Sequence, residues 1–147
     1  MFPFERTIVP HVIQEEQTLA VLNERSTARE AAKLMSERHI GAVLIVERGR
    51  LAGIFSERDL TSRVVAPALD PDKATMAKVM TRNPETIRPT DTVRSALMLM
   101  HQRSFRHLPV VEGTKVIGIV SIRDLQRTVM DQIEADILTV AEHLIKS

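Results

Sequence analysis

The chain has 147 residues, of which 44% are hydrophobic and 27% are charged, and its net charge at pH 7 is +1. A chain of this length buries enough surface to fold without cross-links, and its near-neutral charge argues against a nucleic-acid-binding or membrane-surface protein. The sequence contains no cysteine, which excludes disulfides, thiolate metal sites and a cysteine nucleophile and favours a cytoplasmic location. The longest purely apolar run, Ala42–Val46, is far shorter than a membrane-spanning helix.

The first half of the chain is predicted to hold an N-terminal segment, residues 1–17, and a first structural region, residues 18–66. Pro10 is expected to open a short helix in the segment, because proline favours the first helical position. In the region, Thr27 and Glu30 have the spacing of a capping box, and Gly49 supplies a tight turn between two strands. The predicted elements are an extended piece (Thr18–Leu22), a helix from Ser26 or Thr27, two strands (41–47 and 50–56) and a helix from Ser56.

The second half repeats this order after a linker at residues 67–77, which contains two prolines. The second region covers residues 78–130, with Asp91 as the expected helix cap and Gly113 in the turn between the strands. Its predicted elements are an extended piece (Glu85–Arg88), a helix, two strands (106–112 and 115–121) and a second helix from Ser121. That last helix is expected to continue through a C-terminal extension, residues 131–147, to about Ile145.

The two regions are copies of one unit. Residues 46–60 and 111–125 align at an offset of 65, and eight of these fifteen positions are identical. Each copy has the order β-α-β-β-α, which gives an α/β (α+β) fold. One copy alone would leave a face of its sheet uncovered, so we expect two copies packed with pseudo-twofold symmetry, plus the long C-terminal helix.

The C-terminal helix carries an apolar seam. Met130, Ile133, Ile137, Val140 and Leu144 follow one another at intervals of 3, 4, 3 and 4 residues, the spacing of a short coiled coil. The seam could pack on its own domain or form a subunit interface, and the pattern alone does not choose between them.

The repeated strand-to-helix junction resembles a known family. Gly53-Ile-Phe-Ser-Glu-Arg-Asp-Leu60 and Gly118-Ile-Val-Ser-Ile-Arg-Asp-Leu125 are similar to the signature of cystathionine-β-synthase (CBS) domains. The pair resembles a Bateman module, a stand-alone tandem of CBS domains. The resemblance implies a regulatory module without catalytic residues that binds an adenine nucleotide in the clefts between the copies. It also implies a homodimer with four CBS units in a disc.

By this resemblance the ligand is AMP, ADP, ATP, NAD(H) or S-adenosylmethionine, with AMP the first expectation. The aspartates would accept the ribose hydroxyls, and the serines would reach ribose or phosphate. The neighbouring arginines offer planar donors for phosphate, and backbone groups would read the adenine edge, because only 3% of residues are aromatic. The expected binding residues are Ile40, Gly41, Ala42, Ser56, Arg58, Asp59, Thr86, Ile87, Arg106, His107, Leu108, Pro109, Ser121, Arg123 and Asp124.

The Ser-x-x-Asp pattern has a second interpretation, because a serine followed by an aspartate three residues later can simply cap a helix. Capping and ligand contact can also coexist at one helix start. The two sites are not expected to be equivalent, since Gly41 and Ala42 align with Arg106 and His107, two potential phosphate donors.

The sequence offers little for catalysis or metal binding. It has no closely spaced pair of histidines, no glycine-rich phosphate loop and no nucleophile elbow. Our first hypothesis is therefore a nucleotide sensor that signals to an unknown effector protein, with no required cofactor, no metal, no membrane partner and no nucleic acid. The alternatives are an interaction or dimerisation scaffold without a physiological nucleotide and, last, a small nucleotide-processing enzyme.

Overall fold

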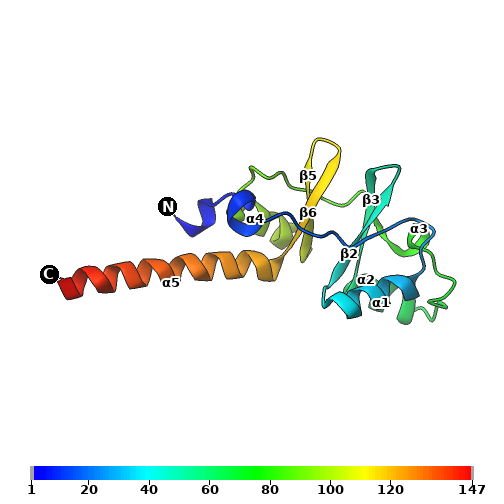
Figure 1. Cartoon of the computed structure of the whole chain (residues 1–147). Coiled ribbons are helices and arrows are strands. Elements are labelled where there is room, and N and C mark those ends of the chain that lie inside the picture. The colour runs from blue at the N-terminus through cyan, green and yellow to red at the C-terminus, as the bar shows by residue number, and fades with distance from the viewer. Residues whose placement is uncertain (1, 147) are drawn as a thin grey trace. The chain divides into compact units, whose positions relative to one another are not determined.

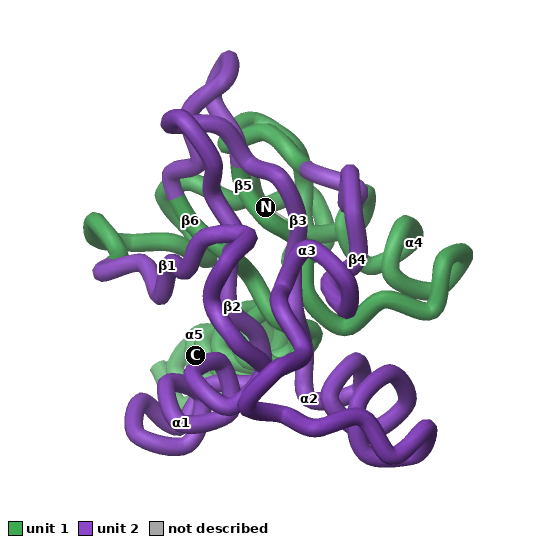
Figure 2. The backbone as a smooth tube through the Cα atoms, turned by 90° about the vertical axis from the view of Figure 1, so that its right-hand side faces the viewer, with its two compact units in different colours: residues 1–17, 87–110, 118–147 green, residues 18–86, 111–117 purple. Residues whose placement is uncertain are grey.

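The computed structural model describes residues 2–146, and the chain divides into two compact units. Unit 1 contains residues 1–17, 87–110 and 118–147, and unit 2 contains residues 18–86 and 111–117 (Figure 2). Each unit is therefore assembled from segments that are distant in the sequence. Figure 1 labels the main helices and strands.

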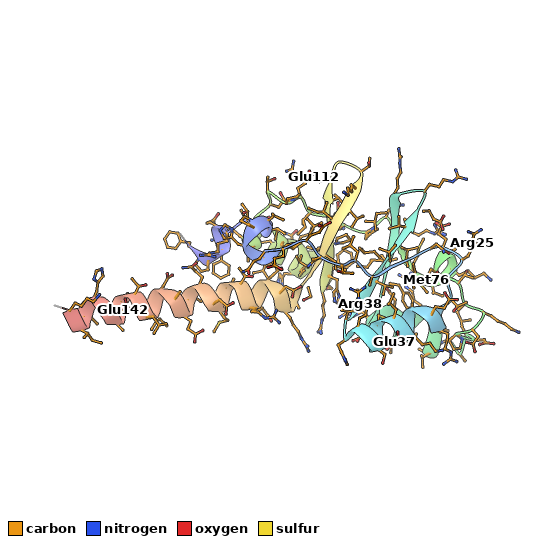
Figure 3. All side chains as sticks on the ribbon, in the orientation of Figure 1. Arg25, Glu37, Arg38, Met76, Glu112 and Glu142 are labelled. Carbon is orange, nitrogen blue, oxygen red and sulfur yellow. The ribbon has the colours of Figure 1, made fainter. Side chains whose placement is uncertain are left out.

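Unit 2 is built on a four-stranded sheet with the strand order β1-β2-β3-β4. Strand β1 runs parallel to β2, whereas the β2/β3 and β3/β4 pairs are antiparallel. The sheet packs with the helices around a core that includes Phe55, Met76 and Val64, all fully buried (Figure 3 labels Met76). The elements are β1 (Val21–Leu22), α1 (Ala28–Arg38), β2 (Ala42–Glu47), β3 (Arg50–Ser56), α2 (Glu57–Asp59), the π-helical turn η3 (Leu60–Val65), α3 (Met76–Val79) and β4 (Thr81–Arg82).

Local chemistry sets the start and end of α1. The hydroxyl of Thr27 accepts a hydrogen bond from the backbone N–H of Glu30 over 3.2 Å, as expected of an N-cap. The helix ends at His39, which adopts a left-handed conformation with φ of 54°. Ala28, Ala31 and Met35 form its buried face, at intervals of three and four residues that place them on one side of the helix.

The two hairpins form as predicted. Gly49 and Gly113 have φ values of +76° and +64°, a region that glycine adopts without steric cost. The β2/β3 ladder is irregular between Ile45 and Val46, and it ends where Ala42 pairs with Ser56, just before α2. The end of the hairpin therefore delivers Ser56 to the start of a helix.

Unit 1 contains the second hairpin, of β5 and β6, which forms a two-stranded sheet, and the tip of this hairpin (residues 111–117) groups with unit 2. The N-terminal segment is attached to the start of α4, because Arg6 accepts a backbone hydrogen bond from Val93 and Glu5 pairs with Arg94 over 2.6 Å. The elements are the short turns η1 (Pro3–Glu5) and η2 (Ile8–Val12), then α4 (Val93–Arg103), β5 (His107–Glu112), β6 (Lys115–Ser121) and α5 (Ile122–Lys146).

Three predictions about these elements were wrong in detail. The N-cap of α4 is Thr92, which forms a capping box with Ser95, and Asp91 instead accepts a hydrogen bond from the backbone of Arg88 over 2.7 Å. Pro10 lies inside the turn that begins at Ile8, so it does not open a helix. The extended pieces are shorter than predicted: β1 is only Val21–Leu22, and within Glu85–Arg88 only Ile87 makes a bridge, to Val110.

Each copy of the repeat has the edge of its second long strand covered in a different way. In unit 2, Gly53 and Ile54 pair with the short strand β4. In unit 1, the side-chain amide of Gln17 covers the strand edge. It accepts a hydrogen bond from the N–H of Ile119 over 2.9 Å and donates one to the carbonyl of the same residue over 3.3 Å. Ile119 is the counterpart of Ile54 at the offset of 65. The two copies of the repeat thus cover equivalent strand edges with different groups, a short strand in one and a glutamine side chain in the other.

Candidate functional site

The helix start after β3 is a closed capping box. The hydroxyl of Ser56 accepts a hydrogen bond from the backbone N–H of Asp59 over 3.2 Å, and Oδ2 of Asp59 accepts one from the backbone N–H of Ser56 over 3.0 Å. The Ser56 hydroxyl also lies 3.2 Å from the same carboxylate oxygen. The two side chains therefore satisfy backbone donors that a helix start leaves free.

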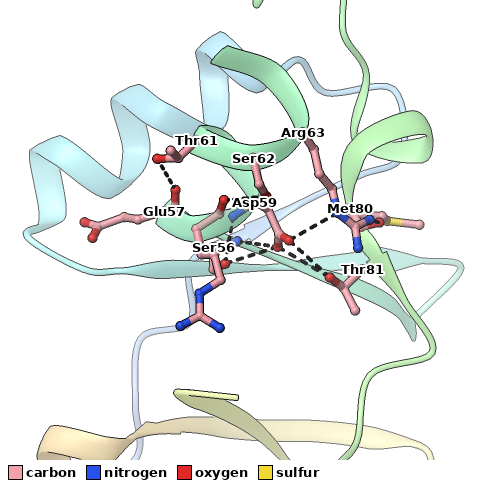
Figure 4. A network of polar contacts seen from close by, with 9 residues as sticks. Ser56, Glu57, Asp59, Thr61, Ser62, Arg63, Met80 and Thr81 are labelled. Atoms are coloured by element: carbon pink, nitrogen blue, oxygen red, sulfur yellow. Dashed lines mark hydrogen bonds and ion pairs between the residues drawn. The ribbon is translucent and has the colours of Figure 1, made fainter. Parts of the chain in front are cut away.

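Two further side chains enclose the Asp59 carboxylate, as Figure 4 shows. The hydroxyl of Thr81 donates to Oδ1 over 3.3 Å, and the guanidinium of Arg63 lies 3.5 Å from the same oxygen. Asp59 is 8% exposed as a residue. Both of its oxygens are occupied by groups of the protein, and the carboxylate is a structural centre of unit 2.

The helix start after β6 repeats the box but leaves it open. The backbone N–H of Ser121 donates to Oδ2 of Asp124 over 2.8 Å, and the Ser121 hydroxyl accepts from the N–H of Asp124 over 3.1 Å. The other carboxylate oxygen has the guanidinium of Arg127 at 3.9 Å. The side chain of Asp124 is 37% exposed, compared with 12% for that of Asp59. Asp124 can therefore accept hydrogen bonds from a ligand, and it lies on the first turn of a 25-residue helix whose positive end favours anions.

Comparison with known proteins identifies the repeated unit. The family model of the CBS domain matches the chain twice, over residues 12–66 and 76–131. The chain belongs to the CBS-domain family. The expected fold class, two CBS repeats followed by a long C-terminal helix, is confirmed by this match and by the solved structures below.

Among curated proteins, the chain is 37% identical over 119 residues to the CBS domain-containing protein CBSCBSPB2 of Arabidopsis thaliana, which is 80% of this chain and 22% of that protein. The chain thus spans about a fifth of the length of this relative. It is 33% identical over 107 residues to the CBS domain-containing protein YhcV of Bacillus subtilis, covering 73% of this chain and 76% of YhcV.

Two solved structures are similar over most of both chains. One is a protein with CBS domains from Burkholderia ambifaria, with a TM-score of 0.81 and 30% identity, which covers 86% of this chain and 95% of that one. The other is the CBS domain protein PAE2072 from Pyrobaculum aerophilum in complex with AMP, with a TM-score of 0.73 and 28% identity over 85% of this chain and 98% of that one.

In the first CBS repeat, the structure brings Gly41, Ser56 and Asp59 together at one end of the β2/β3 hairpin. The carbonyl of Gly41 accepts a hydrogen bond from the backbone N–H of Glu57 over 3.0 Å, which joins the start of β2 to the start of α2. Ile40 and Ala42 flank this glycine, and Arg58 is an exposed residue of α2. Thr86, at the end of unit 2, is exposed as well.

In the second repeat, the same junction forms in unit 1. The backbone N–H of Ile122 donates to the carbonyl of Arg106 over 2.9 Å, the counterpart of the Glu57–Gly41 bond. Ile87 joins this end through a hydrogen bond from its N–H to the carbonyl of Pro109 over 3.0 Å. Leu108 is fully buried, so only its backbone could meet a ligand, whereas Arg106 and Arg123 are exposed and His107 is half-buried.

Sequence reasoning missed the partners of Asp59. Thr81 lies 22 residues away and Arg63 only four, but neither belongs to the repeated motif. A helical i, i+4 spacing signals the Arg63 contact. No pattern signals Thr81, because its position depends on the pairing of β4 with β3.

No group of three or more His, Cys, Asp or Glu side chains among the described residues could hold a metal ion. None of the helices within residues 2–146 combines the length and the apolar character that crossing a membrane requires.

Proposed function

We propose that this tandem CBS protein is a non-catalytic regulatory module that binds an adenine nucleotide, AMP first, at the Ser121–Asp124 helix start. The observation that carries the proposal is the open carboxylate of Asp124, whose side chain is 37% exposed and whose Oδ2 accepts, within residues 2–146, only the hydrogen bond from the backbone of Ser121. The AMP complex of the similar protein PAE2072 supports the choice of ligand.

The chemistry of this helix start suits a nucleoside phosphate. A ribose presents two adjacent hydroxyl donors, and a carboxylate can accept both. The guanidinium groups of Arg106 and Arg123 can donate to phosphate oxygens in bidentate fashion. Backbone groups of Ile87, His107 and Leu108 would read the adenine edge, because the chain has no Trp or Tyr to stack on the base.

In this proposal, the first motif, Ser56–Asp59, has a mainly structural role. The Asp59 carboxylate already holds the Ser56 backbone, the Thr81 hydroxyl and the Arg63 guanidinium. A ribose there would have to displace these partners, and each buried donor left without its acceptor weakens the fold. The residues Ile40, Gly41, Ala42, Arg58 and Thr86 would then form, at most, a weaker second site for the same ligands.

Signalling would follow from differential affinity. A nucleotide that binds one conformation or one state of association better than another shifts the population toward it, and an effector protein can detect the change. The lack of cysteine supports a cytoplasmic location for this module. One observation favours the alternative of a nucleotide-free scaffold, namely the exposed apolar face of α5.

The test is calorimetric titration of the full chain with AMP, and then with ADP, ATP, NAD(H) and S-adenosylmethionine. We expect one tight AMP site per chain that is weakened about tenfold or more in Asp124→Ala, the loss of a charge-assisted hydrogen bond. Asp131→Ala, which removes an exposed carboxylate from the same helix, is the matched control and should bind like the parent protein. Asp59→Ala should weaken AMP binding less than Asp124→Ala, when it is titrated at a temperature at which the variant is fully folded.

Three results would contradict the proposal. Two identical, independent AMP sites per chain would mean that the open and closed motifs are equivalent. No binding of any of the five ligands at roughly millimolar concentration would favour the scaffold. Turnover of a bound nucleotide that disappears in Asp124→Ala would make the protein an enzyme.

A further inference from the structure

The C-terminal half of α5 exposes a large apolar surface. Leu125 and Val129 are buried within unit 1, so the first two turns of the helix are packed. From residue 133 to residue 146 every residue is exposed, and in Figure 1 this part of α5 extends beyond the other elements of its own unit. The exposed apolar side chains are Met130, Ile133, Ile137, Leu138, Val140, Leu144 and Ile145.

This surface is larger than a monomer usually leaves in water. Each of these side chains carries on the order of 100 Å² of apolar surface, and monomeric proteins rarely expose a contiguous patch of more than a few hundred Å². Met130, Ile137 and Leu144 alone are 61%, 62% and 73% exposed. A helix of this kind gains most of its stability from packing of its apolar face, so the face needs a partner.

The spacing of the seam identifies the partner as another helix with the same spacing. Met130, Ile137 and Leu144 occupy one core position of a heptad, and Ile133 and Val140 occupy the other. Such a seam is self-complementary, because each core side chain fits between four residues of a facing helix that repeats every seven residues. A second copy of this chain supplies that helix.

The charges beside the seam indicate the direction of the pair. In a parallel, in-register pair, Glu134 faces Val129 of the second copy and Asp136 faces Ala141, so no like charges meet. In an antiparallel pair that sets Met130 against Val140, Glu134 would face its own counterpart and Asp136 would do the same. Like charges at these flanking positions are destabilising, so the parallel pair is favoured over this antiparallel register.

We propose that residues 130–144 of α5 form a parallel, in-register, two-helix coiled coil with the same residues of a second copy. This pairing does not depend on the nucleotide site, and the buried start of α5 gives it a fixed base in unit 1. Two copies are thereby joined at the end of the helix whose other end carries Asp124.

The test uses the absence of native cysteine, so that a single introduced thiol is the only one in the chain. Leu144→Cys lies in the seam, and Glu142→Cys, two residues earlier, lies on the opposite face of the helix (Figure 3 labels Glu142). Under mild oxidation in dilute solution, we expect Leu144→Cys to form a disulfide-linked dimer and Glu142→Cys to remain a single chain on a non-reducing gel. The control adds Ile137→Glu to Leu144→Cys, which should abolish the cross-link by placing a charge in the seam.

An equal degree of cross-linking by both cysteine variants would overturn the proposal, because contact would then be random. Cross-linking by neither would also overturn it, since residue 144 meets its counterpart only in a parallel pair. Persistence of the dimer in the variant that combines Leu144→Cys with Ile137→Glu would show that the seam does not hold the copies together. AMP titration of Glu142→Cys is a separate measurement, so a failure of the nucleotide site would not be confused with a failure of the coiled coil.

Discussion

The hydroxyl of Thr81 donates a hydrogen bond to Oδ1 of Asp59 over 3.3 Å. At the other copy of the motif, the corresponding oxygen of Asp124 has, among the described residues, only the guanidinium of Arg127, at 3.9 Å. The same Ser-x-Arg-Asp sequence thus forms one closed and one open carboxylate. The difference comes from β4, which supplies Thr81 to the first motif, whereas Gln17 completes the second strand edge without reaching Asp124.

The first prediction concerns the stability that each aspartate provides. Asp59→Ala removes a buried carboxylate that several donors share, and it should lower the free energy of unfolding by about 2–3 kcal/mol. Asp124→Ala removes a half-exposed cap and should cost about 0.5–1 kcal/mol. Urea denaturation of the two variants in the absence of ligand measures the difference, and equal losses would mean that the Thr81 and Arg63 contacts contribute nothing.

The second prediction compares the glycines that precede the two motifs. A Cβ at position 53 would lie 2.7 Å from the carbonyl oxygen of Thr81 and 2.6 Å from the sulfur of Met80. A Cβ at position 118 would lie equally close to atoms of Ile13 and Gln17, but these atoms are the ends of flexible side chains. A backbone carbonyl paired in a sheet cannot move aside as easily, so Gly53→Ala is the more damaging change.

We expect Gly53→Ala to cost about 1–3 kcal/mol of unfolding free energy and Gly118→Ala about 1 kcal/mol or less. Parallel urea titrations of the two variants give the comparison. Since neither glycine has a positive φ, backbone strain does not enter into the result. A larger loss for Gly118→Ala would show that β4 yields more readily than the side chain of Gln17.

The third prediction concerns pH. Arg29 and Asp72 form a surface ion pair with two hydrogen bonds, of 2.9 and 3.3 Å, and the bond from Arg29 lowers the pKa of the Asp72 carboxyl below its ordinary value of 3.8. Because the folded-state pKa is the lower one, the pair stabilises the fold above pH 3.8, and this contribution is lost as the pH falls through the folded-state value. Both side chains are exposed, so the effect is small.

The melting temperature of Asp72→Asn should therefore lie slightly below that of the parent protein at neutral pH and converge with it in acid. High salt should reduce the neutral-pH difference, because it screens exposed pairs. Asp131→Asn, which alters an exposed carboxylate that forms no ion pair among the described residues, serves as the control. A difference that stays constant from neutral pH into acid would exclude the ion pair as its cause.

Much of the fold could be predicted because each element occurs in both copies of the repeat, so two segments of sequence indicate it. The hairpins follow from Gly49 and Gly113 between pairs of predicted strands, and α5 follows from a long stretch without proline or glycine. The cap of α4 does not follow from residue type, since Asp91 and Thr92 are both good N-cap residues. Thr92 is the cap because its hydroxyl accepts a hydrogen bond from the N–H of Ser95, while the Ser95 hydroxyl accepts one from the N–H of Thr92.

The sequence predicted the motif of the candidate site, but it did not predict the surroundings of the two aspartates. Ser56 and Ser121 begin identical patterns, and nothing within those patterns distinguishes Asp59 from Asp124. Burial of Asp59 depends on Thr81, which reaches it through a two-residue strand that is too short to give an alternating pattern. The sequence did suggest inequivalent sites, but from Arg106 and His107 rather than from the carboxylates.

The last prediction concerns Arg106, whose carbonyl fixes the start of α5 while its side chain is exposed. If its guanidinium binds phosphate in the proposed complex, Arg106→Gln should weaken AMP binding about tenfold, the loss of a charge-assisted hydrogen bond. Binding of adenosine, which has no phosphate, should be unchanged. Arg103→Gln, which removes an exposed arginine from the end of α4, is the charge-matched control and should leave both affinities as they are. Calorimetry with the two ligands on the two variants separates a phosphate contact from a general effect of charge, because a general effect would appear equally in both arginine variants.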